Sequence, residues 1–177
     1  MRGVLLVPIG AVDSAILDYL ALILAEVLDV PARVETLRVA VDPAFDPRRQ
    51  QYLATRLVEA LHDFQSAEGE KILGIAEVDL MIPILTFVFG EAELSGRAAV
   101  LSLARLKQEF YGLPEDPILL YHRAEKEVLH ELGHTAGLIH CNDPECVMRF
   151  SSSVEEVDLK GDRFCPRCAA ALGKRRR

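Results

Sequence analysis

The sequence lacks a long hydrophobic run. Its richest internal apolar stretch, residues 19–25, is seven residues long, whereas about 20 are needed to cross a bilayer. The apolar start that follows Met1 and Arg2 resembles a secretion signal, but Asp13 and Asp18 interrupt the pattern. We therefore expect no signal peptide, no membrane partner and a cytoplasmic location.

The chain also lacks an excess of basic residues. It has 20 Lys and Arg against 27 Asp and Glu, for a net charge of -7, which argues against general nucleic-acid binding. It contains no internal repeat and no low-complexity segment. Its 177 residues, half of them hydrophobic, fit one compact domain with a sizeable core, and we expect a monomer.

Hydrophobic periodicity predicts an alternation of strands and helices in the first half of the chain. The expected strands are residues 4–9, 33–39, 71–80, 85–89 and 98–103. The expected helices are residues 13–29, 51–64, 122–135 and 166–172, the first of them opened by Asp13 as its N-cap. The opening β-α-β-α order implies a right-handed crossover and a partly parallel sheet. The later strands are too close together for helical crossovers, which suggests an antiparallel edge.

Residues 130–140 carry the chemistry. They read His-Glu-Leu-Gly-His-Thr-Ala-Gly-Leu-Ile-His and match H-E-x-x-H-x-x-G-x-x-H at every fixed position. Positions i and i+4 share one helix face, so His130 and His134 can bind a single zinc ion. Glu131 is rotated by about 100° from His130, and from there it can reach a zinc-bound water without binding the metal.

The third ligand requires the helix to stop. On a continuing helix, His140 would lie about 9 Å beyond His134 along the axis. Gly137 is the natural place for the bend, because glycine accepts the left-handed conformation that closes a helix. Three histidines then leave a fourth position for water, with Glu131 taking its proton and passing it to the leaving amine.

A helix that merely happens to contain histidines is the alternative. Random ordering of this composition gives the full pattern in roughly one chain in a hundred thousand, so we prefer the metal site. The other two histidines, His62 and His122, lack ligand spacing and are expected on polar helix faces.

All four cysteines follow the third histidine, as Cys141-x4-Cys146 and Cys165-x2-Cys168. This spacing predicts a structural zinc site of four thiolates that ties the loop-rich C-terminal segment to the active-site helix. Two disulfides or a redox-active Cys165-x-x-Cys168 are the alternatives, and the missing secretion signal weighs against disulfides. Because Cys141 directly follows His140, we hypothesise that the second metal also positions the catalytic ligand.

The histidine motif, the cysteine after it, the two cysteine pairs and a nearby methionine resemble the archaemetzincin family of metzincin metallopeptidases. The upstream strand and helix order is also similar to the metzincin scaffold, so the resemblance covers essentially the whole chain. It implies a Met-turn at Met148 beneath the metal. Some metzincins carry a tyrosine two residues later as a ligand or transition-state donor, but Phe150 stands here. Oxyanion stabilisation would then come from zinc, backbone amides or an unidentified residue.

The resemblance also implies that an edge strand borders the cleft and pairs with an extended substrate. Its residues would be Thr86, Phe87, Val88, Phe89 and Gly90. An edge strand that is only protected by the acidic Glu91 and Glu93 is the alternative for this segment.

The sequence therefore predicts a zinc metallopeptidase that acts on peptides or proteins and holds one catalytic and one structural zinc ion. The resemblance allows an aminopeptidase-like preference. A zinc-containing peptide-binding or regulatory module with weak or no turnover is the alternative, which the general base Glu131 disfavours. The expected fold is α/β (α+β), with a mixed, mostly parallel sheet, an antiparallel edge strand and backing helices. We expect one catalytic domain, residues 1–177, made of an N-terminal part (1–137) and a small C-terminal part (138–177).

Overall fold

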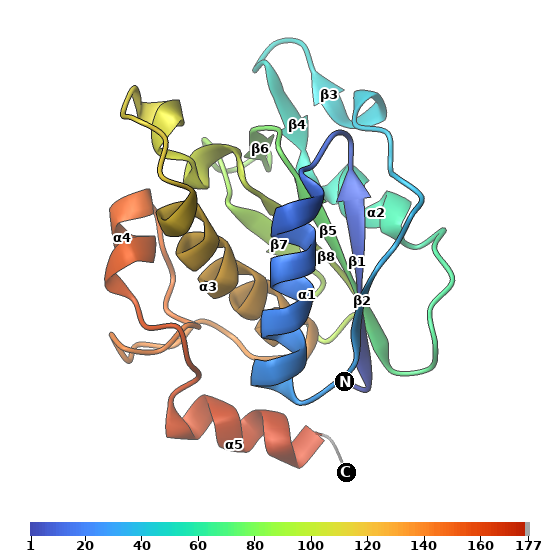
Figure 1. Ribbon diagram of the computed structural model, residues 1–177, viewed down its shortest axis with the longest axis vertical. Helices are drawn as coiled ribbons and strands as arrows, with labels where there is room; N and C mark the ends of the chain where they lie inside the picture. The colour runs from blue at the N-terminus through green and yellow to red at the C-terminus, as the bar shows by residue number, and fades with distance from the viewer. Residues whose placement is uncertain (176–177) are drawn as a thin grey trace.

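A five-stranded sheet forms the centre of the molecule in the computed structural model, which describes residues 1–175 and the side chains of residues 1–173 (Figure 1). The strand order is β2-β1-β5-β8-β7. In that order the strands are Ala32–Val34, Gly3–Ile9, Glu70–Ala76, Ala98–Ser102 and Gly90–Ala92. The first four run parallel, and β7 pairs antiparallel with β8 at the edge. The mixed, mostly parallel sheet with an antiparallel edge is thus confirmed.

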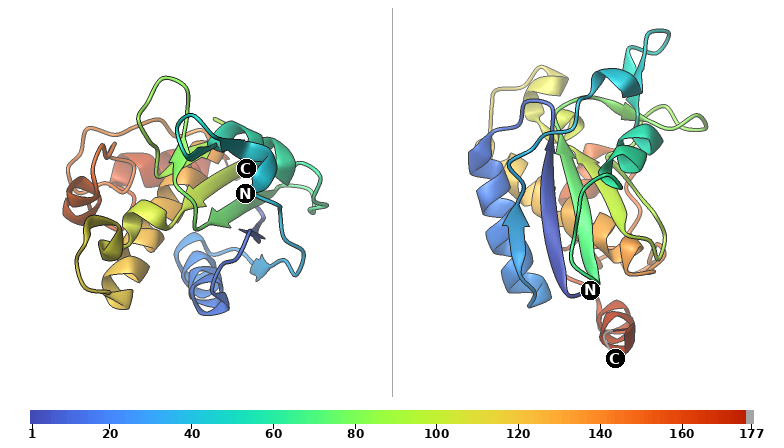
Figure 2. Two further views of the ribbon diagram at one scale, coloured as in Figure 1. Left: turned by 90° about the horizontal axis from the view of Figure 1, so that it is seen from above. Right: turned by 90° about the vertical axis from the view of Figure 1, so that its right-hand side faces the viewer.

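Helices cover both faces of this sheet. Helices α1 (Ser14–Leu28) and α3 (Pro117–Thr135) lie on one face, and α2 (Ala54–Leu61) lies on the other (Figures 1 and 2). Strand β1 shows why, because its side chains alternate between two cores. Val4 and Leu6 pack with α1 and α3, whereas Leu5 and Val7 pack with α2. A strand buried on both faces is apolar throughout, as residues 4–9 are.

Aspartates begin both long helices. The Asp13 carboxylate accepts a hydrogen bond from the N–H of Ala15 at the start of α1, as expected. Helix α3 begins five residues earlier than the expected residue 122, at Pro117. The Asp116 carboxylate accepts from the N–H of Leu119 at 2.9 Å, and proline suits the first helical position because it has no N–H to satisfy.

A second, three-stranded sheet was not expected. It consists of β3 (Phe45–Asp46), β4 (Gln51–Leu53) and β6 (Leu80–Met81). Residues 51–53 form β4, in which residues 52–53 pair with residues 80–81. The helix predicted over 51–64 therefore begins only at Ala54, and the strand predicted over 71–80 ends at Ala76. The strand predicted over 33–39 is also too long, since only 32–34 pair with β1. Short 3-10 helices cover Asp42–Ala44, Ala104–Leu106 and Gln108–Tyr111.

The edge strand lies a few residues later than predicted. Residues 85–89 are not a strand, although Val88 forms an isolated bridge with Leu80, and β7 is Gly90–Ala92 instead. A strand that opens on glycine has little intrinsic β propensity. Its pairing with β8 is a tertiary contact that local sequence does not reveal.

The C-terminal part contains α4 (Val154–Leu159), which was not expected, and α5 (Pro166–Arg175). Two ion pairs join the α4 region to α3. Arg123 binds Asp158 through two hydrogen bonds of 2.7 Å, and Lys160 lies 2.6 Å from Glu127. The apolar core on this side of the sheet runs without interruption from the sheet into residues 138–168.

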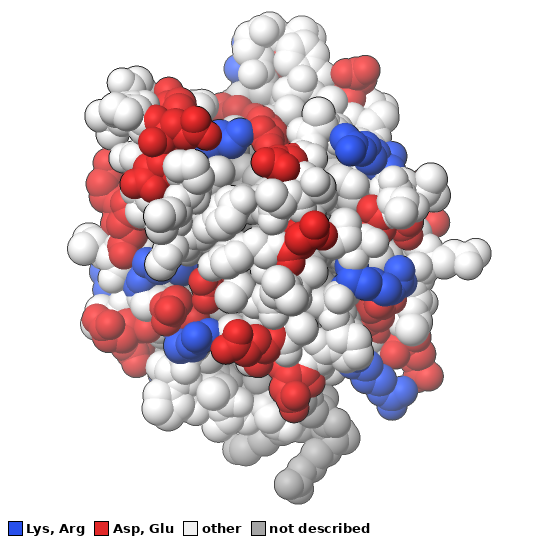
Figure 3. All heavy atoms as spheres, viewed as in Figure 1, with Lys and Arg blue, Asp and Glu red and all other residues white. Residues whose placement is uncertain are grey.

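The face that carries α1 and α3 shows acidic side chains spread between fewer basic ones, with no broad basic patch in view (Figure 3). This distribution agrees with the net charge of -7. Among the described helices, none is long and apolar enough to span a bilayer.

Candidate active site

The three histidines of the motif converge at the end of α3. His130 and His134 lie on one face of the helix, with their Nε2 atoms 3.0 Å apart. The helix ends at Thr135 with Ala136 as its C-cap, and the next residue, Gly137, takes a left-handed φ of 86° that turns the chain back. His140 thereby returns to the same place, and one ring nitrogen from each histidine lies within 4.8 Å of the others. The predicted glycine bend is present.

Two backbone carbonyls fix which ring nitrogen faces the centre. The Nδ1–H of His130 donates to the carbonyl of Val147 at 2.9 Å, and the Nδ1–H of His134 donates to that of Leu138 at 2.8 Å. Both Nε2 atoms then carry lone pairs, which would repel each other at 3.0 Å without a cation between them. Tetrahedral zinc with bonds of 2.0–2.1 Å places two nitrogens about 3.3 Å apart. The donor set and its geometry fit a zinc ion.

Burial keeps the imidazoles neutral, which is the form that binds metal. Burial lowers the pKa of His130 well below its ordinary value, and the nearby Lys160 ammonium adds to this effect. Burial also lowers the pKa values of His134 and His140. Glu131 shifts the other way: burial, and then the neighbouring carboxylate of Glu127, raise its pKa well above the ordinary value. A carboxylate in such a site accepts a proton readily.

Strand β7 confines the Glu131 carboxylate. Glu131 is buried and lines the cleft, and Gly90 lies directly beside it. A Cβ atom on residue 90 would lie 2.6 Å from Glu131 Oε1 and 2.6 Å from the carbonyl oxygen of Val100. Only glycine therefore lets the edge strand approach the active-site helix this closely.

Met148, the residue of the proposed Met-turn, packs against α3 at Gly133. It is fully buried, and a Cβ atom on Gly133 would lie only 2.3 Å from its Sδ. The helix turn between the two histidines thus rests directly on this methionine. Phe150 packs its ring on His140, with 5.0 Å between the ring centroids, so it supports the third histidine without offering a hydroxyl.

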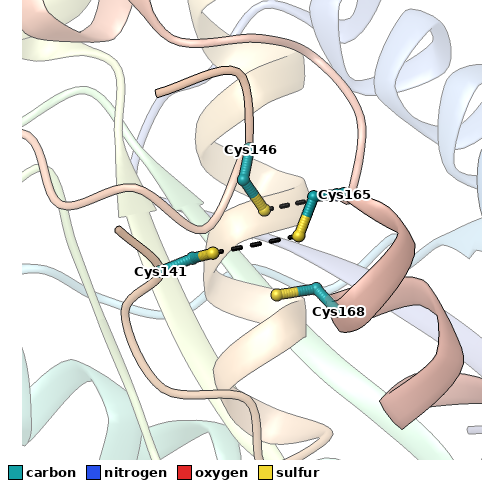
Figure 4. Close-up of side chains that lie close together, drawn as sticks. All are labelled: Cys141, Cys146, Cys165 and Cys168. Carbon is teal, nitrogen blue, oxygen red and sulfur yellow. Dashed lines mark hydrogen bonds between the residues drawn. The ribbon is translucent and has the colours of Figure 1, made fainter. Parts of the chain in front are cut away.

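The four cysteines also converge, with their sulfur atoms within 4.8 Å of one another (Figure 4). Cys141 and Cys146 come from the chain after α3, Cys165 directly precedes α5, and Cys168 lies in the first turn of α5. The Sγ atoms of Cys141 and Cys165 are 3.8 Å apart, and all four cysteines are free thiols. Two thiolates on one tetrahedral zinc with 2.3 Å bonds lie about 3.8 Å apart, so this cluster also fits zinc, and no disulfide is present among the described residues.

The thiols of this cluster differ in their environments. Burial alone would raise the pKa of Cys141, but hydrogen bonds from the Asp143 backbone N–H and the Arg167 side chain lower it to about 7. Burial raises the pKa of Cys168. A cation is the usual means of holding four such sulfurs together as thiolates.

A cleft with a volume of about 420 Å³ opens beside the histidines. All five residues predicted for substrate binding, Thr86, Phe87, Val88, Phe89 and Gly90, line it, together with Glu131 and the three histidines. The side chains of Glu91 and Glu93, next along the chain, both have hydrogen-bond partners. The Glu91 carboxylate accepts from the Thr55 hydroxyl at 3.0 Å, and the Glu93 carboxylate lies 2.6 Å from Nε2 of His62.

The remaining histidines lie outside this cleft, since His62 and His122 are both exposed. Glu127, Ser151 and Ser152 line the cleft but were not identified from the sequence. A signal existed for Glu127, because it precedes His130 by three residues and Glu131 by four and so shares their helix face.

Three ring nitrogens beside a buried carboxylate, on a mixed sheet with an antiparallel edge, are the arrangement of a zinc-dependent metallopeptidase. The sequence profile of Peptidase family M54 matches residues 13–174. The chain belongs to this family. The relatives that are similar to it are named archaemetzincins.

Relatives and solved structures agree with this assignment. The archaemetzincin of Methanocaldococcus jannaschii is 41% identical over 168 residues, which span 95% of this chain and 91% of the relative. The crystal structure of archaemetzincin from Methanopyrus kandleri superimposes with a TM-score of 0.84 at 38% identity, covering 98% of this chain and 94% of that one. The crystal structure of a zinc-dependent peptidase from Methanocorpusculum labreanum superimposes with a TM-score of 0.87 at 32% identity, covering 96% of this chain and 100% of that one.

Proposed function

We propose that this peptidase cleaves peptide bonds at the three-histidine centre, with His130, His134 and His140 holding a catalytic zinc ion and Glu131 acting as general base. The observation that carries the proposal is the 3.0 Å approach of two Nε2 atoms whose rings are each fixed by a carbonyl on the opposite nitrogen. A zinc ion bound there supplies Lewis acidity to water and to the substrate carbonyl. Glu131 takes the proton of the attacking water and passes it to the departing amine.

The substrate is proposed to lie along β7 in an extended conformation. This strand forms the edge of the sheet and borders the cleft, so one of its sides can pair with a peptide backbone. The substrate-binding segment predicted from the sequence, Thr86 to Gly90, continues directly into this strand. Its aromatic residues, Phe87 and Phe89, pack edge to face with ring centroids 5.3 Å apart and give the cleft an apolar wall.

The four cysteines are proposed to hold a second, structural zinc ion, which gives two per chain. Cys141 follows His140 directly, and its N–H donates to the carbonyl of Met148 at 2.9 Å. The second metal would therefore stabilise the bend that presents His140. The division into parts at residues 137 and 138, the monomeric state and the cytoplasmic location stay predictions of the sequence.

The test combines metal analysis with a peptide-library cleavage assay on the parent protein and on Glu131→Gln. Both proteins should contain two zinc ions per chain, and the variant should lose cleavage, because the amide cannot accept the proton. A Glu93→Gln variant serves as the control, since that carboxylate bonds to His62 outside the cleft. Equal cleavage by the parent and Glu131→Gln would refute the mechanism.

A further inference from the structure

One wall of the cleft is a segment without regular secondary structure. Residues 82–87, the wall segment, follow β6, and four of them, Ile82, Leu85, Thr86 and Phe87, line the cleft. The backbone hydrogen bond inside this segment joins the N–H of Leu85 to the carbonyl of Ile82 at 3.2 Å. A loop with so little internal bonding keeps one conformation only if other parts of the chain hold it.

Arg49, in the turn between β3 and β4, bonds to three backbone carbonyls of the wall segment. Its Nη1 donates to the carbonyl of Ile82 at 3.3 Å, and its Nη2 donates to those of Leu85 at 2.8 Å and Thr86 at 2.6 Å. Its Nε donates to the Gln51 side chain at 3.0 Å, which in turn donates to the carbonyl of Thr86 at 3.0 Å. Because a guanidinium is planar and its N–H donors point in fixed directions, these carbonyls are held in one arrangement.

The bonds of Gln51 continue to the aromatic side chain of the wall segment. Gln51 also donates to the Asp79 carboxylate at 2.9 Å, and Asp79 accepts two hydrogen bonds from Arg105, at 2.6 and 2.8 Å. Arg105 places its guanidinium carbon 4.1 Å from the centre of the Phe87 ring, within the range of a cation–π contact. None of Arg49, Gln51, Asp79 and Arg105 lines the cleft. They support the backbone and the ring of the wall from outside the cleft.

We propose that Arg49 is a positioning residue for the peptidase reaction: it holds the wall segment in the conformation that contacts the peptide, and so determines peptide affinity without taking part in the chemistry. This inference rests on the proposed peptidase function. Without the guanidinium, three carbonyl oxygens lose a donor and can bond to water in several loop conformations. Peptide affinity then falls in proportion to the fraction of molecules that keep the binding conformation. In the described structure Arg49 bonds to neither the three histidines nor Glu131, so kcat should change little.

The test compares Arg49→Met with the parent on a library peptide that the parent cleaves. If the binding conformation falls to about one molecule in five, KM rises about fivefold, while kcat and zinc content stay close to those of the parent. Arg49→Lys keeps the positive charge but not the planar fork of donors, so its KM should also rise. An unchanged KM in Arg49→Met, or the parent's KM in Arg49→Lys, would overturn the inference.

Hydrogen exchange measures whether Arg49 orders the wall segment when no substrate is present. Arg48→Met is the matched control, because Arg48 is exposed and its side chain forms no hydrogen bond or ion pair within the described residues. The amides of residues 82–88 should exchange faster in Arg49→Met than in Arg48→Met, whereas those of the buried strand β1 should exchange alike in both. Equal exchange over residues 82–88 would refute the anchoring role of Arg49.

Two zinc-binding probes separate failure of this inference from failure of the proposed function. Acetohydroxamate and the hydroxamate of the tripeptide Pro-Leu-Gly bind zinc through the same group, but only the tripeptide extends beyond the metal along the cleft. In isothermal titration of zinc-loaded protein, Arg49→Met should weaken binding of the tripeptide probe about fivefold and leave acetohydroxamate binding unchanged, even if the parent cleaves no peptide. Equal effects on the two probes would show that Arg49 does not act through the wall segment.

Discussion

Replacing Gly133 with alanine is expected to push the active-site helix away from the Met-turn. The new Cβ would lie 2.3 Å from Met148 Sδ, 3.1 Å from its Cε and 3.3 Å from Phe164 Cε1. Ordinary contacts between carbon atoms are about 3.5–4.0 Å. The Met148 side chain, which is fully buried, would therefore have to move by more than about 1 Å. Overpacking of this kind costs about 1–3 kcal/mol.

The chain provides a matched control for this substitution. Gly173 lies in α5, and a Cβ there would meet nothing within 4 Å. Both changes gain the same helix propensity, about 1 kcal/mol for alanine over glycine, so their difference isolates the clash. Gly133→Ala should be less stable than Gly173→Ala by about 2 kcal/mol, which corresponds to a Tm lower by about 4–8 °C in a chain of this size.

Zinc binding should respond as well. Met148 follows Val147, whose carbonyl orients His130, and a disturbed outer partner of a metal ligand lowers metal affinity by about 10- to 100-fold. Thermal unfolding of the zinc-saturated variants and competition with a zinc chelator measure the two effects. Equal Tm values and equal zinc affinities for the Gly133 and Gly173 variants would refute the claim that the helix rests on Met148.

Further substitutions test other parts of the site. Gly90→Ala should lower kcat by about 100-fold at unchanged zinc content, because a shift of about 1 Å in Glu131 suffices for such a loss; unchanged kcat would contradict the steric role of Gly90. Cys165→Ser should weaken zinc binding at the catalytic site by loosening the turn that carries His140, and competition titration would disprove the coupling if affinity stayed the same. Asp116→Ala should lower the free energy of unfolding by about 1 kcal/mol through loss of the helix cap, measurable by urea denaturation with activity retained.

The sequence alone predicted the elements whose signals are local. The apolar run at residues 4–9, the aspartate cap of α1 and the histidine spacing on α3 each depend on neighbours within a few residues. The same holds for Gly137, because the need for a left-handed residue follows from bringing His140 back to His134. The paired cysteines likewise predicted their cluster, which the structure confirms as a geometric group.

Only the tertiary structure decided the features that depend on residues far apart in the chain. Residues 51–53 form a strand because residues 45–46 and 80–81 pair with them, and no local periodicity could reveal this pairing. Gly90 opens the edge strand beside Glu131 for the same reason, because β7 forms by pairing with β8 although glycine has a low β propensity. Lys160, thirty-three residues after Glu127, reaches it only through the packing of α4 on α3. Local sequence determines which groups are available, but the free energy of burial and pairing between distant segments determines which of them meet.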